Sequence, residues 1–106
     1  MGGIYVSGTA ISVSTQANVV SVACSLSSQL FLGVNTSRKG MIIFNGAIYD
    51  LFVKFGSLDG VSPTNFTIVI PANGTYESPT SVFCGDIWGA WDQYDGEGKA
   101  QITELW

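Results

Sequence analysis

The chain has 106 residues, of which 46% are hydrophobic and only 11% are charged, and its net charge is −4. One domain of this size can bury a real core. An average globular chain, however, carries roughly 25% charged residues, so part of the surface is expected to be covered by other protein. Only four residues are Lys or Arg, which excludes a surface that follows nucleic-acid phosphates.

The N-terminal third carries no Asp, Glu, Lys or Arg before Arg38. It also lacks an apolar run long enough to cross a bilayer, so neither a membrane nor a nucleic acid is expected as a partner. Residues 1–19 alternate only weakly, and they bury too little apolar surface to offset an ordering entropy of about 1–2 kcal/mol per residue. We therefore expect 1–19 to be an arm or edge strand, mobile in an isolated subunit and ordered against another chain. Residues 20–106 are expected to form the β-sandwich domain.

Strand-like alternation of apolar and polar residues recurs along the domain. It predicts strands within 20–26, 49–55, 66–70 and 100–105. Phe52 interrupts the alternation of the second of these, which indicates that this strand is covered on both faces near its middle. The alternating apolar positions predict a buried core of Val20, Val22, Leu51, Val53, Phe55, Ile68 and Ile87.

Turn-forming pairs lie between these segments at short spacing, among them Asn45-Gly46, Asp59-Gly60 and Asn73-Gly74. Asn-Gly and Asp-Gly supply the positive φ that tight hairpin turns need, so residues 40–55 are predicted to form a hairpin about Asn45-Gly46. No stretch has a convincing helical period. Short strands with frequent turns predict an all-β fold, a single small antiparallel β-sandwich or barrel.

Cys24 and Cys84 are the only cysteines in the chain. A disulfide between them would close a long loop and stabilise the fold by roughly 4 kcal/mol in the chain-entropy model. The alternative is a pair of buried, reduced thiols in a protein made in a reducing cytosol. We favour the reduced thiols.

A series of short motifs begins at Asn35 and continues almost to the C-terminus. It resembles a group of short β-rich proteins of tailed bacteriophages, which occur among virion structural genes and sometimes at the end of longer fibre-like chains. The resemblance implies a virion component, of head decoration, cement or fibre-associated type. The motifs are Asn35-x-Ser37-Arg38-Lys39-Gly40, Met41-Ile42-Ile43-Phe44-Asn45, Leu51-Phe52-Val53-Lys54-Phe55-Gly56, Phe66-Thr67-x-x-Ile70-Pro71, Gly74-x-Tyr76-Glu77-x-Pro79, Gly85-x-Ile87-x-Gly89-x-Trp91 and Gly98-x-Ala100-x-Ile102-Thr103-Glu104-Leu105.

The residues offer little catalytic chemistry. The chain has no histidine, the commonest general base and metal ligand, so we expect no enzyme activity, no catalytic residue and no cofactor. Asp92, Asp95 and Glu97 form an acidic cluster of the kind that supplies oxygen ligands to calcium. Their spacing does not match an EF-hand loop, however, so a solvated acidic turn without a metal is expected.

Six residues are candidates for contacts with other molecules. Trp88, Trp91 and Tyr94 lie close together in the sequence, and such aromatic residues fill cores, line protein interfaces or form platforms for sugars. Trp106 is a second aromatic candidate. Arg38 and Lys39 are the only adjacent cations, and they are expected either to bind an acidic patch on a neighbouring subunit or to form a solvated turn.

These observations predict a non-enzymatic structural protein of a tailed-phage virion, specifically a head decoration or cement subunit. Its expected partners are the major capsid protein or other virion proteins, and its expected location is the virion, after synthesis in the host bacterial cytoplasm. A homo-oligomer is expected, with a trimer favoured, because closed symmetry dominates among homo-oligomers and capsid shells offer threefold sites. The alternatives are a carbohydrate-binding β-domain for host attachment and a neck or tail adaptor.

Overall fold

The computed structural model describes residues 13–56 and 60–106. These residues form strands, turns and irregular segments and contain no helix, so none of their elements is a helix that could span a membrane. The expected all-β class is confirmed. The strands are β2 (Ala17–Ala23), β3 (Gln29–Leu32), β4 (Gly40–Asn45), β5 (Leu51–Phe55), β6 (Ile68–Ile70), β7 (Thr75–Glu77), β8 (Ile87–Trp91) and β9 (Lys99–Leu105).

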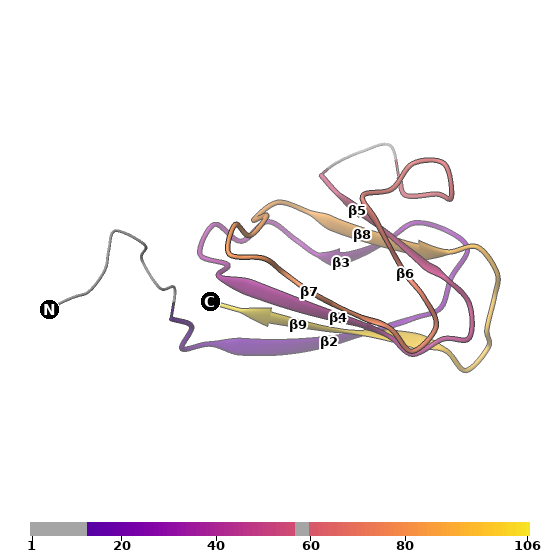
Figure 1. Ribbon diagram of the computed structural model, residues 1–106, viewed down its shortest axis with the longest axis horizontal. Helices are drawn as coiled ribbons and strands as arrows, with labels where there is room; N and C mark the ends of the chain where they lie inside the picture. Colours follow the sequence, from indigo (N-terminus) through magenta and orange to yellow (C-terminus); the bar gives the residue numbers. More distant parts are fainter. Residues whose placement is uncertain (1–12, 57–59) are drawn as a thin grey trace, which may run out of the picture.

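Two antiparallel sheets of four strands pack face to face as a sandwich (Figure 1). One sheet has the order β2-β9-β4-β7, and the other has the order β3-β8-β5-β6. The pairs are nested along the chain: β5 pairs with β6, β4 with β7, β3 with β8 and β2 with β9. Two further pairings, β4 with β9 and β5 with β8, complete the sheets. This nested order is the arrangement of an eight-stranded jelly roll.

The core lies between the two sheets and is built from alternate residues of each strand. Leu51, Val53 and Ile87 are fully buried, as predicted. The other four predicted core residues are partly buried and pack against the edge of the core: Val20, Val22, Phe55 and Ile68. The structure therefore places all seven on the inner side, with the edge positions less completely covered.

A β-bulge in β3 adds a large ring to this core. The register with β8 shifts between Leu30 and Leu32, so Phe31 is an extra residue, and both Phe31 and Leu32 are buried. The Phe31 ring fits only because Gly89 lies opposite it: a Cβ atom on Gly89 would come 2.1 Å from the Phe31 ring. Phe31 also contacts Trp91, with ring centroids 6.0 Å apart.

The predicted hairpin over residues 40–55 is wrong. β4 and β5 belong to different sheets and do not pair. Asn45 ends β4 with its side chain fully buried, where Nδ2 donates to the carbonyls of Tyr49 and Ile70 and Oδ1 accepts from the indole of Trp91. Asn45 thus serves as a polar link inside the core, and its chain segment crosses from one sheet to the other.

The predicted domain boundary at residue 20 differs slightly from the structure, because β2 already begins at Ala17. β2 is an edge strand of its sheet, so the part of the predicted arm at 17–19 belongs to the sandwich. Residues 1–12, to which the expectation of a mobile arm chiefly applies, lie outside the described residues.

Both cysteines are free thiols, as favoured from the sequence. The Cys24 thiol is buried, lies 3.5 Å from the carbonyl oxygen of Gln93 and accepts a hydrogen bond from the Asp95 amide at 3.4 Å. The Cys84 thiol is partly buried and contacts the carbonyl oxygen of Arg38 at 3.5 Å. Each sulfur is therefore part of the local packing of a loop.

Candidate protein interface

The outer face of the β2-β9-β4-β7 sheet carries very few charged residues. Because side chains alternate along a strand and the inward residues of β4 and β9 are buried, the outward set follows from the register. We call this set the open face. It consists of Ala17, Val19, Ser21 and Ala23 of β2, Lys99, Gln101, Thr103 and Leu105 of β9, Gly40, Ile42 and Phe44 of β4, and Thr75 and Glu77 of β7.

The only charged residues on this face are Lys99, the first residue of β9, and Glu77, the last residue of β7. Among its apolar residues, Val19 is 62% exposed and Phe44 is 36% exposed. Its other polar groups are small hydroxyls and one amide, and Ser21 donates to Gln101 at 2.8 Å. The open face is therefore partly apolar and suited to contact with another protein surface.

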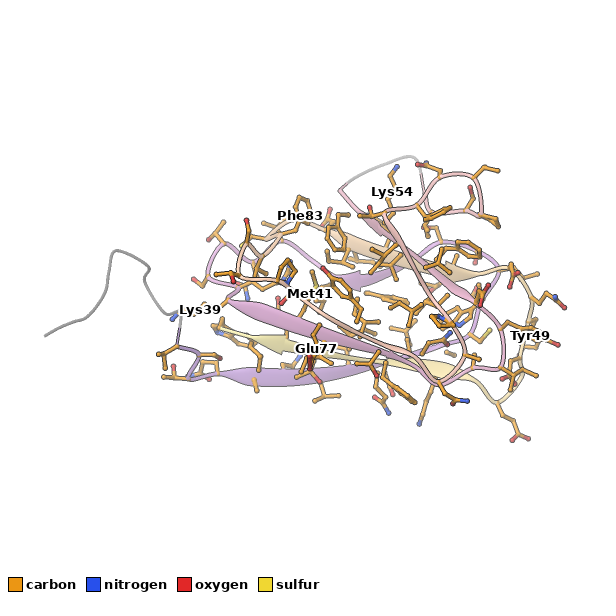
Figure 2. The ribbon with its side chains drawn as sticks, in the orientation of Figure 1. Lys39, Met41, Tyr49, Lys54, Glu77 and Phe83 are labelled. Atoms are coloured by element: carbon orange, nitrogen blue, oxygen red, sulfur yellow. The ribbon has the colours of Figure 1, made fainter. Side chains whose placement is uncertain are left out.

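A shallow hollow adjoins the open face where β4 begins. The start of β4 and the segment after β7 line it, and Lys39, Met41 and Glu77, which are labelled in Figure 2, are among its lining residues. Gly40 also lines it and packs closely against Leu105: a Cβ atom at position 40 would come 3.2 Å from Leu105 Cδ1. The hollow and the open face share Gly40, Ile42 and Leu105, so a partner seated on one would contact the other.

Arg38 does not fit its predicted place at an interface, because its side chain is completely buried. Nε contacts a carboxylate oxygen of Glu104 at 2.8 Å. Nη1 donates to the carbonyls of Phe83 and Gly85, and Nη2 donates to that of Gly33. A guanidinium has five donors in a fixed fork, and here that fork ties the β3–β4 loop to the β7–β8 loop and to β9.

Lys39 is exposed, unlike its neighbour. Its ammonium group donates to the carbonyl of Val13 at 2.8 Å, just before β2 begins. Trp106 is half-buried and lies beside the same segment: its amide donates to Gln16, and its main-chain oxygen accepts from Thr15 and Gln16. Lys39 and Trp106 therefore hold the entry to β2 in place and remain candidates for contact with a neighbouring chain.

The three clustered aromatic residues are not brought together. Trp91 faces the main core and is 1% exposed, so it is a core residue and its predicted place at an interface is wrong. Trp88 faces the other side of β8, where it packs with Phe52, Val61 and Ala90 on the outer face of the second sheet. Only Tyr94 projects freely, at 64% exposure. A single aromatic platform for a sugar is therefore not formed by this set.

Tyr94 lies at the end of the sandwich where four loops meet, the β2–β3, β4–β5, β6–β7 and β8–β9 connections (Figure 1). Leu26 and Ile48 are also strongly exposed in these loops. The strand predicted within 20–26 included Leu26, but β2 ends at Ala23, and the sequence did not single out Ile48. Each is an apolar residue in a turn segment, and that could have marked them. The same loops carry the acidic residues Asp50, Asp92, Asp95 and Glu97.

The acidic residues Asp92, Asp95 and Glu97 lie in the β8–β9 loop, where Asp95 makes hydrogen bonds that stabilise the loop. The Asp95 carboxylate accepts from the amides of Ile48 and Glu97 at 3.1 Å each, which links the β4–β5 and β8–β9 loops. Asp92 and Glu97 are exposed. Across residues 13–56 and 60–106, no group of three or more His, Cys, Asp and Glu side chains is placed to hold a metal ion.

Compared with models of protein families, with curated proteins and with solved structures, the chain has no match.

Proposed function

We propose that this chain is a non-enzymatic structural subunit of a tailed-phage virion, specifically a head decoration or cement protein that stabilises the capsid through protein–protein contacts. The observation that carries the proposal is the open face, a sheet surface on which the register places only two charged residues, Lys99 and Glu77. Exposed apolar patches on small domains mark sites of interaction. The resemblance of the motifs from Asn35 onward to phage virion proteins supports the same proposal.

The motif residues contribute mainly to the framework. Arg38 and Glu104 form the buried ion pair, and Asn45 and Trp91 form the polar link in the core. The resemblance therefore concerns the scaffold. Since a scaffold alone does not determine function, the partner is expected to bind an exposed surface, and we choose the open face because it carries few charged residues.

A cement protein of this kind needs no catalysis. A protein that binds the assembled shell but not its free subunits stabilises the shell by mass action. The open face would supply mainly apolar and hydroxyl contacts, which salt screens little. We therefore expect attachment to the particle to persist at high ionic strength.

The test uses a phage that encodes the chain, with heads assembled in its absence. Purified protein is added back, and bound copies are counted by quantitative mass spectrometry and located by electron microscopy. Thr103→Lys places a charge in the middle of the open face, whereas Thr64→Lys places the same charge on an exposed loop beside the other sheet. We expect Thr103→Lys to reduce attachment at least tenfold and Thr64→Lys to leave it unchanged. Absence of the wild-type protein from every particle fraction would refute the proposal.

Two alternatives give different results in the same assays. A neck or tail adaptor would be located at one vertex or on the tail, in few copies, rather than over the head. A carbohydrate-binding domain is favoured by one observation, the free Tyr94 side chain between Gln93 and Asp95 at the loop end. Binding on a glycan array that is lost in Tyr94→Ala would support that alternative. A homo-oligomer, with a trimer favoured, remains part of the proposal and is measured by light scattering.

A further inference from the structure

The four edge strands of the sandwich differ in how well they are protected against pairing with another chain. β7 has three residues and is followed closely by Pro79, and β6 has three residues and is followed directly by Pro71. β3 has four residues and contains the bulge at Phe31. Short length, proline and bulges are the usual devices that prevent edge pairing. Three of the four edges therefore carry such a device.

β2 carries none of them. It has seven residues, pairs with β9 in an unbroken register, and contains no proline and no charged residue. No described strand pairs with its other side. An edge that is long, regular and uncharged is the kind that adds a further strand.

The main-chain groups that β2 offers follow from its pairing with β9. Gln16 and Trp106 exchange two hydrogen bonds, and at the other end the Cys24 amide donates to Gly98. Since hydrogen-bonded and non-hydrogen-bonded pairs alternate in an antiparallel ladder, the even-numbered residues between them point their amides and carbonyls at β9. The odd-numbered residues point theirs outward, and these are Ala17, Val19, Ser21 and Ala23.

We propose that β2 pairs antiparallel with β2 of a second copy, about a twofold axis at Val20. In this register Val19 lies opposite the partner's Ser21, and Ala17 lies opposite the partner's Ala23. Every outward amide and carbonyl of these four residues then has a partner. The two β2-β9-β4-β7 sheets become one sheet of eight strands, and the two open faces become one continuous surface.

A second copy fits this edge better than an unrelated strand for two reasons. β2 has no charge, so two copies meet without like-charge repulsion. Val20 and Val22 pack only partly against the core at this edge. In the proposed register Val20 lies opposite the partner's Val20, so the two side chains would cover each other, and Val22 lies opposite the partner's Asn18. The contact is isologous, so by itself it produces a dimer, and it competes with the trimer that the proposed function favours. The inference does not depend on the proposed virion function.

Charge pairs provide the sharpest test, because the proposed register places residues 19 and 21 opposite each other. In a variant with both Val19→Lys and Ser21→Lys, like charges lie directly across the interface. We expect it to be monomeric by sedimentation velocity at concentrations where the wild type is dimeric. A variant with Val19→Glu and Ser21→Glu should also be monomeric, and an equimolar mixture of the two should form dimers. A Lys variant that stays dimeric, or a mixture that stays monomeric, would overturn the register.

Two separate proline variants, one on β2 and one on β7, test the main-chain hydrogen bonds of the proposed contact. Ser21→Pro removes an outward amide from β2, while Glu77→Pro removes an outward amide from β7 at the opposite edge of the same sheet. We expect Ser21→Pro to be monomeric and Glu77→Pro to remain dimeric. If Ser21→Pro fails to fold, amide exchange in the wild type decides the point: the Val19 and Ser21 amides should be protected in the dimer at high concentration and exposed on dilution.

The alternative to β2 of a second copy is that residues 1–12 of a second copy pair with this edge. Deleting residues 2–12 distinguishes pairing by β2 from pairing by residues 1–12. We expect the deletion variant to dimerise as tightly as the full chain, within threefold in dissociation constant. Loss of the dimer would show that the segment itself supplies the added strand. A wild type that is monomeric at millimolar concentration would refute both forms of edge pairing.

Discussion

The two sheets of the sandwich differ in what lies on their outer faces. On the β3-β8-β5-β6 sheet, Val61 packs against Phe52 and Ala90, and Phe66 contacts the Phe52 ring edge-on at 5.2 Å. The β5–β6 connection thereby covers this face. Residues 60–67 of that connection lie on the side of the sandwich away from the open face (Figure 1).

This difference indicates where the chain depends on a neighbour. A sheet needs cover on its apolar face, and the β3-β8-β5-β6 sheet obtains cover on its outer face from its own chain. The outer face of the other sheet carries only two charged residues, Lys99 and Glu77, and it exposes Val19 and Phe44. The low charged fraction of the sequence is therefore apparent on this surface.

The largest effect is expected at Arg38, which links the β3–β4 loop to the β7–β8 loop and to β9. Arg38→Met should lower the free energy of unfolding by about 3–5 kcal/mol, because it leaves the Glu104 carboxylate buried without its partner and deprives three carbonyls of a donor. Lys39→Met, one residue away and exposed, should change it by less than about 0.5 kcal/mol. Chemical denaturation of both variants measures the difference. Equal effects would mean that the buried pair contributes no more than a surface turn.

A second comparison tests the two outer faces directly. Phe52→Ala on the covered face should destabilise the protein by about 3 kcal/mol, because a ring only 9% exposed loses its contacts and leaves a cavity. Phe44→Ala on the open face, where the ring is 36% exposed, should cost about 1 kcal/mol or less. Thermal unfolding at low concentration, where any oligomer is dissociated, gives both values. The distinction between the faces fails if Phe44→Ala is the more destabilising.

The smallest effect is expected from the redox state. Because Cys24 and Cys84 are separate thiols packed in different loops, adding a reductant should leave the melting temperature unchanged. Thiol titration should count two free groups in unfolded protein. In the native state Cys84, which is partly exposed, should react faster than the buried Cys24. A reductant-dependent melting temperature would instead indicate a disulfide.

Much of the fold was predictable from local pattern. The alternation at 49–55 and 100–105 corresponds to β5 and β9, and the stop at Pro71 corresponds to the end of β6. Phe52 indicated that β5 is covered on both faces, and it is buried beneath the β5–β6 connection. These features depend on the side-chain period of a strand, which residues a few positions apart reveal.

The errors arose where a residue's partner lies far away in the sequence. Asn45 before Gly46 has the composition of a hairpin turn. Its side-chain oxygen, however, accepts a hydrogen bond from the Trp91 indole, and nothing near Asn45 in the sequence identifies that partner. Arg38 was expected at an interface or in a solvated turn because it forms the only adjacent pair of cations with Lys39. Its partner, Glu104, lies on β9, which pairs with β4 in the same sheet but is 66 residues away in the sequence. The low charge of the sequence predicted that some surface would contact another protein, but it did not identify which face of the sandwich that surface is.

The nested pairing order has a consequence for how this chain folds. β5 and β6 are close in sequence and can pair early, whereas β2 must wait for β9, the strand farthest from it along the chain. Closing such distant pairs costs loop entropy before any contact compensates it, so folding is expected to be slow for a domain of this size. β9 also separates β2 from β4 within the sheet. Until β9 pairs with β4, β2 has no strand beside it. A substitution that prevents β9 from pairing would therefore remove both β9 and β2 from the sheet.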